Sequence, residues 1–203
     1  MQTATVASTV VIGGISFNSG LARQAEGNIG QIVTLPAGVA GAVSPTGVDG
    51  LATGHGFQAD DVIDVHWTDP TDGVSHKCRR GVKVDTASAN AITFDNSPAA
   101  EGDALPAEDT AVVVARQVSI NTDFDGDDVV IVGAKADQRA MVDFRSAAVS
   151  LAAKKLAACE AFLWASNWGF ANPLAGDPVD VVKCSNGTTT SATLYLGLLY
   201  DSV

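Results

Sequence analysis

The chain has 203 residues, enough for one hydrophobic core or two small ones. It carries 12 basic and 23 acidic residues, a formal net charge of -11, which excludes a broad basic surface for DNA or RNA. Only 17% of the residues are charged, below the share of about 25% that is usual in globular proteins. Because an isolated domain normally keeps a more charged exterior, this composition favours a protein that buries surface against other subunits.

The sequence shows no targeting or membrane segment. It has no run of about 18 apolar residues, so no transmembrane helix is expected. The N-terminal stretch Val6–Ile15 lacks a basic start and is interrupted by polar residues and glycines, which is untypical of a secretory signal. The cysteines Cys78, Cys159 and Cys184 lack the spacing of a metal or redox motif. We expect free thiols in a protein made in a reducing cytoplasm.

Short β-strand patterns separated by turn residues dominate the chain, and amphipathic helical patterns are nearly absent. The first elements are two long candidate strands and a glycine-rich stretch: Thr3–Ile12, Asn28–Leu35 and Gly38–Gly56. Four short candidate strands follow: Asp60–Thr68, Lys77–Val84, Ala91–Asp95 and Thr110–Gln117. Their lengths and spacing predict a small closed barrel of the SH3-like kind.

Alternation along the first two short strands predicts which side chains share a face. In the first strand, one face has Val62, Asp64, His66 and Thr68, and the other has Ile63, Val65 and Trp67. This pattern is typical of a half-buried strand. In the second strand, alternation places on one face Cys78, Arg80, Val82 and Val84. The sequence Asp69-Pro70-Thr71-Asp72-Gly73 between the two strands predicts a turn.

Five longer candidate strands come after the barrel: Gln117–Asp123, Val129–Val132, Ala140–Arg145, Val179–Cys184 and Ala192–Tyr200. The stretch from Ala147 to Trp164 is ambiguous, because its summed helix propensity is high but its apolar residues do not hold a 3.6-residue period. Phe162 and Trp164 alternate with Glu160 as strand residues do. We predict a strand pair there, with one helix as the alternative.

The simplest assembly of these elements is an all-β protein. It has a β-sandwich from residues 1–48 and 117–203, with a small β-barrel from residues 49–116 inserted between its strands. The barrel segment has 12 acidic and 5 basic residues, a net charge of -7, and the remainder has 11 and 7, a net charge of -4. We therefore expect the barrel to face solvent and the sandwich to pack against neighbouring molecules.

One acidic stretch resembles the start of a calcium-binding loop, with carboxylates at alternate positions: Asp123, Asp125 and Asp127. Position 12 of such a loop falls at Val132, where a bidentate glutamate should stand. The pattern fails at its most informative ligand. We expect an ordinary exposed turn and no metal or other cofactor, with a calcium or magnesium site as the alternative.

No catalytic residue is predicted. The histidines His55, His66 and His76 are 11 and 10 residues apart, and no helix brings them into register for zinc, so structural or surface roles are expected. None of the cysteines stands beside a feature that would activate a nucleophile. The sequence also lacks a serine-hydrolase elbow, a P-loop and a dinucleotide-binding fingerprint.

Acidic and aromatic residues leave two alternatives open. Asp64, Asp143 and Glu160 lie in apolar surroundings, so a hydrolase with two catalytic carboxylates is an alternative, although capping or cross-strand pairing is the expected role. Aromatic residues between Phe162 and Phe170 favour a core or a subunit interface, with a sugar-binding platform as the alternative. The predicted interface anchors are Phe17, Trp164, Trp168, Phe170 and Tyr200.

Two stretches of sequence carry a family resemblance. The first comprises Gly54–Phe57 and Asp61–Trp67, and the second comprises Asn172–Asp177, Ser185–Gly187 and Ala192–Asp201. Together they resemble small virion structural proteins of tailed bacteriophages, among them capsid decoration (cement) proteins. The resemblance implies a β-rich protein without catalytic residues or cofactors, which sits as a trimer on the outer capsid where capsid subunits meet.

The resemblance implies the major capsid protein and sibling copies as partners, no nucleic acid or membrane, and a location on the capsid surface of a virion assembled in the host cytoplasm. The net charge of -11 favours the outside, because packaged DNA fills the interior. A tail-tube or other tail or neck protein is the main alternative, with Ser16–Gly30 and Ala37–Gly56 as candidate arms. A carbohydrate-binding or adhesion module is a further alternative.

Overall fold

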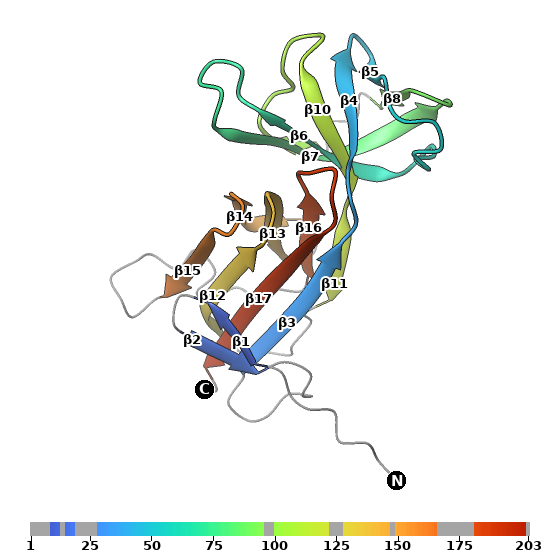
Figure 1. Ribbon diagram of the computed structural model, residues 1–203. Coiled ribbons are helices and arrows are strands. Elements are labelled where there is room, and N and C mark those ends of the chain that lie inside the picture. Colours follow the sequence, from blue (N-terminus) through green and yellow to red (C-terminus); the bar gives the residue numbers. More distant parts are fainter. Residues whose placement is uncertain are drawn as a thin grey trace.

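The computed structural model describes residues 9–12, 15–18, 28–95, 100–121, 128–146, 149–165 and 181–201 (Figure 1). Every regular element among these residues is a β-strand, which confirms the predicted all-β class. Within these ranges no helix is long and apolar enough to cross a membrane. The strands form a closed barrel and, below it in Figure 1, two further sheets and a hairpin.

Six strands close the barrel in the order β6-β10-β4-β5-β8-β7, and β7 pairs back with β6. Their bounds are β4 (Val39–Ser44), β5 (Gly47–Asp49), β6 (Val62–Thr68), β7 (His76–Ala87), β8 (Ile92–Phe94) and β10 (Ala111–Arg116). The short β9 (Glu101–Gly102) pairs with β7 outside the ring. The barrel sheet thus includes β4 and β5, whose residues the sequence placed mostly with the sandwich.

Strand β7 departs from the alternation expected from its sequence. Cys78 pairs with His66, but Val82 pairs with Ile63, so β7 has one residue more than β6 between these two pairs. This extra residue is a β-bulge, and Gly81 adopts the positive φ of 66° that such a bulge favours in glycine. The prediction that Cys78, Arg80, Val82 and Val84 share one face is therefore wrong: Val82 and Val84 fill the barrel core, whereas Cys78 and Arg80 point out of it.

The sandwich consists of two four-stranded sheets. We call one the junction sheet; its order is β11-β16-β13-β14, with bounds β11 (Val118–Asn121), β16 (Val181–Asn186), β13 (Ala140–Ser146) and β14 (Val149–Leu156). We call the other the far sheet; its order is β15-β12-β17-β3, with bounds β15 (Ala161–Ala165), β12 (Asp128–Ala136), β17 (Ala192–Asp201) and β3 (Asn28–Leu35). Their facing sides share one hydrophobic core, which includes Phe144, Val182, Leu194 and Leu196.

The ambiguous stretch from 147 to 164 contains strand residues and no helix among its described residues, so the helix alternative is wrong, but the two strands do not form the predicted pair. The two strands do not pair with each other, because β14 lies in the junction sheet and β15 in the far sheet. The chain turns the corner between the sheets at Ala157–Glu160, where the Glu160 carboxylate accepts a hydrogen bond of 2.8 Å from the Ala157 backbone N–H. Glu160 therefore has the capping role that its sequence context suggested.

An N-terminal hairpin of β1 (Thr9–Ile12) and β2 (Ile15–Asn18) packs on the side of the far sheet that faces away from the core. Register places Gly133, Gly197 and Gly30 side by side on β12, β17 and β3. All three glycines are buried, and a Cβ atom on Gly133 would lie 3.1 Å from the side chain of Ile12. The missing side chains let the fully buried Ile12 approach the sheet closely.

The barrel packs through β6 and β7 against the outward face of the junction sheet (Figure 1). Alternation along β13 sends Val142 and Phe144 into the sandwich core, and Met141, Asp143 and Arg145 toward the barrel. All five side chains are buried, since the barrel covers the face that solvent would otherwise reach. The contact between barrel and sandwich is therefore the place where buried polar groups meet.

Candidate functional site

The polar face of β6 lies buried in the junction between the barrel and the sandwich. Asp64 is 2% exposed and His66 is 1% exposed. The sequence pattern suggested that only one face of β6 is buried, but both faces are. His66 does lie opposite Trp67, which belongs to the barrel core. Ser185 of β16, which is fully buried, lies against this polar face of β6.

Hydrogen bonds join these residues in a chain across the junction. Ser185 Oγ donates to Asp64 Oδ2 at 2.5 Å, and His66 Nε2 lies 2.9 Å from the same Ser185 oxygen. Because Ser185 has one proton and gives it to Asp64, His66 Nε2 is the donor to Ser185. His66 Nδ1 then accepts from His76 Nε2 at 3.0 Å, and the two rings stack with centroids 5.3 Å apart. This series of hydrogen bonds ends at His76, whose Nδ1 has no hydrogen-bond partner among the described residues.

Asp64 has further partners within the barrel. Its Oδ1 accepts from the Gly81 backbone N–H at 2.9 Å and from Gln117 Nε2 at 2.7 Å. The first bond explains the position of the carboxylate, since it satisfies the backbone N–H of the glycine in the β7 bulge. Both carboxylate oxygens of Asp64 are therefore held by hydrogen bonds: Oδ1 by the Gly81 N–H and Gln117, and Oδ2 by Ser185.

Burial controls the protonation of this group. It raises the pKa of Asp64, lowers the pKa of His66 well below its usual value and lowers the pKa of His76 to about 3. It also raises the pKa of the Cys78 thiol well above its usual value. Both imidazoles are therefore neutral and Cys78 is a protonated thiol at neutral pH.

Three potential ligand atoms meet beside Ser185. Strand pairing places Cys78 directly opposite His66, with Cys78 Sγ 3.9 Å from His66 Nε2. A carboxylate oxygen of Asp64, a ring nitrogen of His66 and the Cys78 sulfur all lie within 4.8 Å of one another, and all three residues are buried. The hairpin of β6 and β7 thus brings together an oxygen, a nitrogen and a sulfur donor.

A second polar group, centred on Asp143, lies farther along the junction. Asp143 Oδ2 lies 2.5 Å from Arg80 Nη1 of the barrel and 2.6 Å from Arg145 Nη1 of its own strand. Glu101 pairs with both arginines at 3.2 to 3.3 Å, and Ser150 donates to Asp143 Oδ1 at 2.5 Å. Asp143 is therefore a buried ion-pair partner, the kind of role expected for an acid in these surroundings.

Two cavities open beside the junction. One of about 140 Å³ lies between β7 and the junction sheet, with a lining of Cys78, Arg80, Gly102, Asp103, Met141, Ala153 and Lys155. One of about 290 Å³ lies nearby, and its lining includes Trp67, Lys77 and Asp103. Within the smaller cavity, Lys155 Nζ is 2.9 Å from Asp103 Oδ2, so this lysine is already paired.

The group contains a serine, a histidine and an aspartate but lacks the order of a hydrolytic triad. In such a triad the histidine accepts the serine proton and the aspartate holds the histidine. Here Ser185 donates to Asp64, His66 donates to Ser185, and the serine is fully buried. This arrangement joins two parts of a protein and does not generate a nucleophile.

The other residues singled out in the sequence do not join this site. His55 lies in a barrel loop, where its Nδ1 accepts from the Phe57 N–H at 3.0 Å and its Nε2 is 2.8 Å from the Ser88 carbonyl. The proposed anchors Phe17, Trp164 and Tyr200 fall on β2, β15 and β17. The residues that lie outside the described ranges are Asp123, Asp125, Asp127, Trp168 and Phe170.

Sequence reasoning missed the pairing of Cys78 with His66 and the contribution of Ser185. The first had a signal: a tight turn centred on Asp72 puts residue 78 opposite residue 66, as the observed register does. Ser185 had none, because it lies 119 residues from His66 and on a different sheet. Comparisons with family models, curated proteins and solved structures found no match for the chain.

Proposed function

We propose that the protein is a noncatalytic structural protein of a tailed-phage virion that decorates and stabilises the capsid exterior. Its sandwich would bind capsid subunits and sibling copies, and its barrel would project into solvent. The observation that carries this proposal is the uneven division of the molecule into an acidic barrel and a weakly charged sandwich with open sheet edges.

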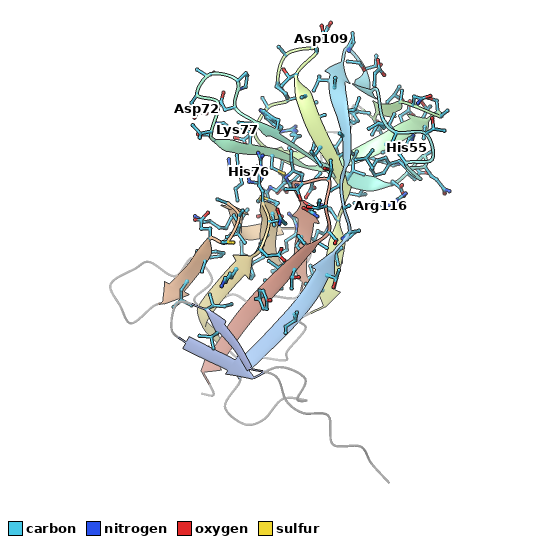
Figure 2. All side chains as sticks on the ribbon, viewed as in Figure 1. His55, Asp72, His76, Lys77, Asp109 and Arg116 are labelled. Carbon is cyan, nitrogen blue, oxygen red and sulfur yellow. The ribbon has the colours of Figure 1, made fainter. Side chains whose placement is uncertain are left out.

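The acidic charge gathers on the barrel. Residues 39–116 have a net charge of -7 and the remainder has -4. Figure 2 shows Asp72 and Asp109 on barrel loops that point away from the sandwich, whereas His76 lies on the side toward it. A strongly negative outer end keeps decorated particles apart by repulsion and leaves the sandwich end as the less charged contact surface.

The sandwich has strand edges suited to assembly. Strands β3 and β15 end the far sheet, β11 and β14 end the junction sheet, and none of these four edges pairs with a further strand among the described residues. Ile32 of β3 is 50% exposed and Val149 of β14 is 64% exposed. Monomeric proteins usually protect such edges with charges, so apolar side chains here favour contact with another protein.

The places of three of the five predicted aromatic anchors support this orientation. Phe17, Trp164 and Tyr200 lie on strands of the far sheet or of the hairpin that covers it, and Tyr200 falls at the end of β17 farthest from the barrel (Figure 1). A capsid-binding surface on the far sheet would leave the barrel free. Contacts repeated at every lattice position would add through multivalency, so each one need not be strong.

The proposal is tested by adding purified protein to phage heads that lack it, then measuring co-sedimentation and the temperature of head rupture. We expect binding and a higher rupture temperature. Ile32→Asp and Val149→Asp should weaken both effects, whereas Val74→Asp, at an 80% exposed apolar position in a barrel turn, should not. Unchanged rupture temperature, fractionation of the protein with tails, or binding to a glycan array instead of heads would contradict it.

A further inference from the structure

We propose that Asp64, His66 and Cys78 form a binding site for a zinc-like divalent ion, which Ser185 completes from the sandwich. The ion would fasten the barrel hairpin to the junction sheet. This role is separate from capsid binding and does not depend on it.

The geometry of one hairpin builds the site. Asp64 and His66 are two residues apart on β6 and so share a face, and Cys78 stands opposite His66 on β7. The ligand atoms lie within 4.8 Å of one another, with 3.9 Å between His66 Nε2 and Cys78 Sγ. Tetrahedral zinc with bonds of about 2.0 to 2.3 Å needs ligand separations of about 3.3 to 3.7 Å, so small side-chain rotations close the shell.

The donor set selects the kind of ion. Calcium and magnesium prefer shells of oxygen ligands, whereas thiolate and imidazole favour zinc and its neighbours in the first transition row. Ser185 Oγ is the nearest further donor, 2.9 Å from His66 Nε2 and 2.5 Å from Asp64 Oδ2. These are hydrogen-bond lengths, shorter than the tetrahedral spacing, so Ser185 must rotate outward to take the fourth position. A closed shell of four protein ligands in a buried place is typical of structural and not catalytic zinc.

The charges balance when the ion binds. Binding releases the Cys78 thiol proton to solvent, so the thiolate and the Asp64 carboxylate supply two negative charges to a divalent cation. The loaded site is neutral, which suits a group that is only 1 to 2% exposed. No oxidant or other reactant takes part.

The surroundings already orient the ligands. The Gly81 N–H and Gln117 hold Asp64 by Oδ1, whereas Oδ2 accepts only from Ser185 among the described residues and can turn to the ion when Ser185 rotates. When His66 Nε2 binds a metal, the ring proton moves to Nδ1 and is donated to His76 Nε2. The His76 proton then moves from its Nε2 to its Nδ1, so both rings remain neutral.

A cavity also lies near the site. Cys78 lines the cavity of about 140 Å³ between β7 and the junction sheet. Asp103 in the same lining provides a carboxylate. The cavity therefore lies beside one of the three ligand residues.

The test uses the full chain after treatment with a chelator, titrated with Zn²⁺ and, in parallel, with Co²⁺. We expect one ion per chain, a cobalt spectrum with tetrahedral and thiolate bands, and a melting temperature raised by about 5 to 10 °C at a zinc concentration 100 times the Kd. X-ray absorption of the zinc-loaded protein should show one sulfur at about 2.3 Å and nitrogen or oxygen ligands at about 2.0 to 2.2 Å.

The three free cysteines provide matched controls. Cys78→Ser and Asp64→Asn should lose the thiolate band or the uptake, whereas Cys159→Ser, at an exposed turn, and Cys184→Ser, in the sandwich core, should keep both. No uptake, a zinc shell without sulfur, or a thiolate band that survives in Cys78→Ser would overturn the proposal. The X-ray absorption measurement on the unmodified chain tests for the sulfur ligand even if a variant does not fold.

Discussion

Asp143 illustrates how much a single buried residue contributes to the junction. Its side chain is 4% exposed and pairs with Arg80 from the barrel and Arg145 from the sandwich. Taking these charges out of water is costly, and their mutual attraction offsets the cost only while all partners are present. Removal of the central carboxylate takes a buried acidic partner from two nearly buried guanidinium groups, both of which also pair with the more exposed Glu101.

We therefore expect Asp143→Asn to lower the free energy of unfolding by about 3 kcal/mol, measured by urea denaturation. The control is Asp60→Asn, which breaks an ion pair with Lys83 in which the aspartate is 81% exposed. Because solvent screens that pair, its loss should cost less than about 1 kcal/mol. Similar losses in the two variants would show that the junction ion pairs do not stabilise the fold.

Glu101 should make stability depend on pH. A hydrogen bond from Arg145 is the main cause that lowers the pKa of Glu101 below its usual 4.5. A carboxylate whose pKa is lower in the folded state stabilises the protein above pH 4.5, and this contribution disappears as the pH falls through the folded pKa. The difference in unfolding free energy between wild type and Glu101→Gln should therefore be largest near pH 7 and shrink below pH 4.5.

Urea denaturation at a series of pH values measures this difference. Glu108→Gln, at an exposed acid in a barrel loop, is the matched control and should show a smaller dependence. A Glu101→Gln difference that stays constant from pH 7 to pH 3 would contradict the assigned role of the Arg145 hydrogen bond.

At the scale of elements, strands with a clear alternation of polar and apolar residues were predictable from the sequence. What packs against each face of these strands was not. The expected strand Asn28–Leu35 coincides with β3, and the face alternation of β6 is as predicted. The burial of the polar face of β6 depends on Ser185, which belongs to a strand distant in sequence. The residues around Asp64 therefore give no sign of it. The β7 bulge at Gly81 was also not predicted, because a strict alternation of faces assumes that no extra residue is inserted.

The row of glycines on the far sheet provides a test at the scale of an element. A Cβ atom at Gly133 would lie 2.9 Å from Leu163 and 3.1 Å from Ile12. We expect Gly133→Val to destabilise the protein by about 1 to 3 kcal/mol through overpacking and to displace the N-terminal hairpin. Limited proteolysis, read by mass spectrometry, should then show faster cleavage at residues 9–18.

The control for this change is Lys135→Val, two residues along the same strand and on the same face. Lys135 lies at a partly exposed position, so added branching there should leave the hairpin in place. Equal cleavage rates in wild type and Gly133→Val would contradict the role of Gly133 in seating Ile12.

For the whole molecule, the sequence indicated a barrel and a sandwich but placed their boundary too late. β4 and β5 lie in a stretch of glycine and small residues that gives little strand signal, yet they pair with β10 and β8 inside the barrel. The polar junction was not predictable either, because its residues come from β6, β7, β9, β13 and β16. Asp64, Asp143 and His66 were recognised singly, and only the packing of barrel on sheet assembles them.

The proposed orientation on a capsid is a property of the whole molecule, and a cryo-electron microscopy map of the virion that carries the protein tests it most directly. We expect density on the outer capsid surface where capsid subunits meet, with the sandwich against the shell and the acidic barrel pointing into solvent. Density within the tail or neck, or a barrel seated against the shell with the far sheet exposed, would contradict the proposal.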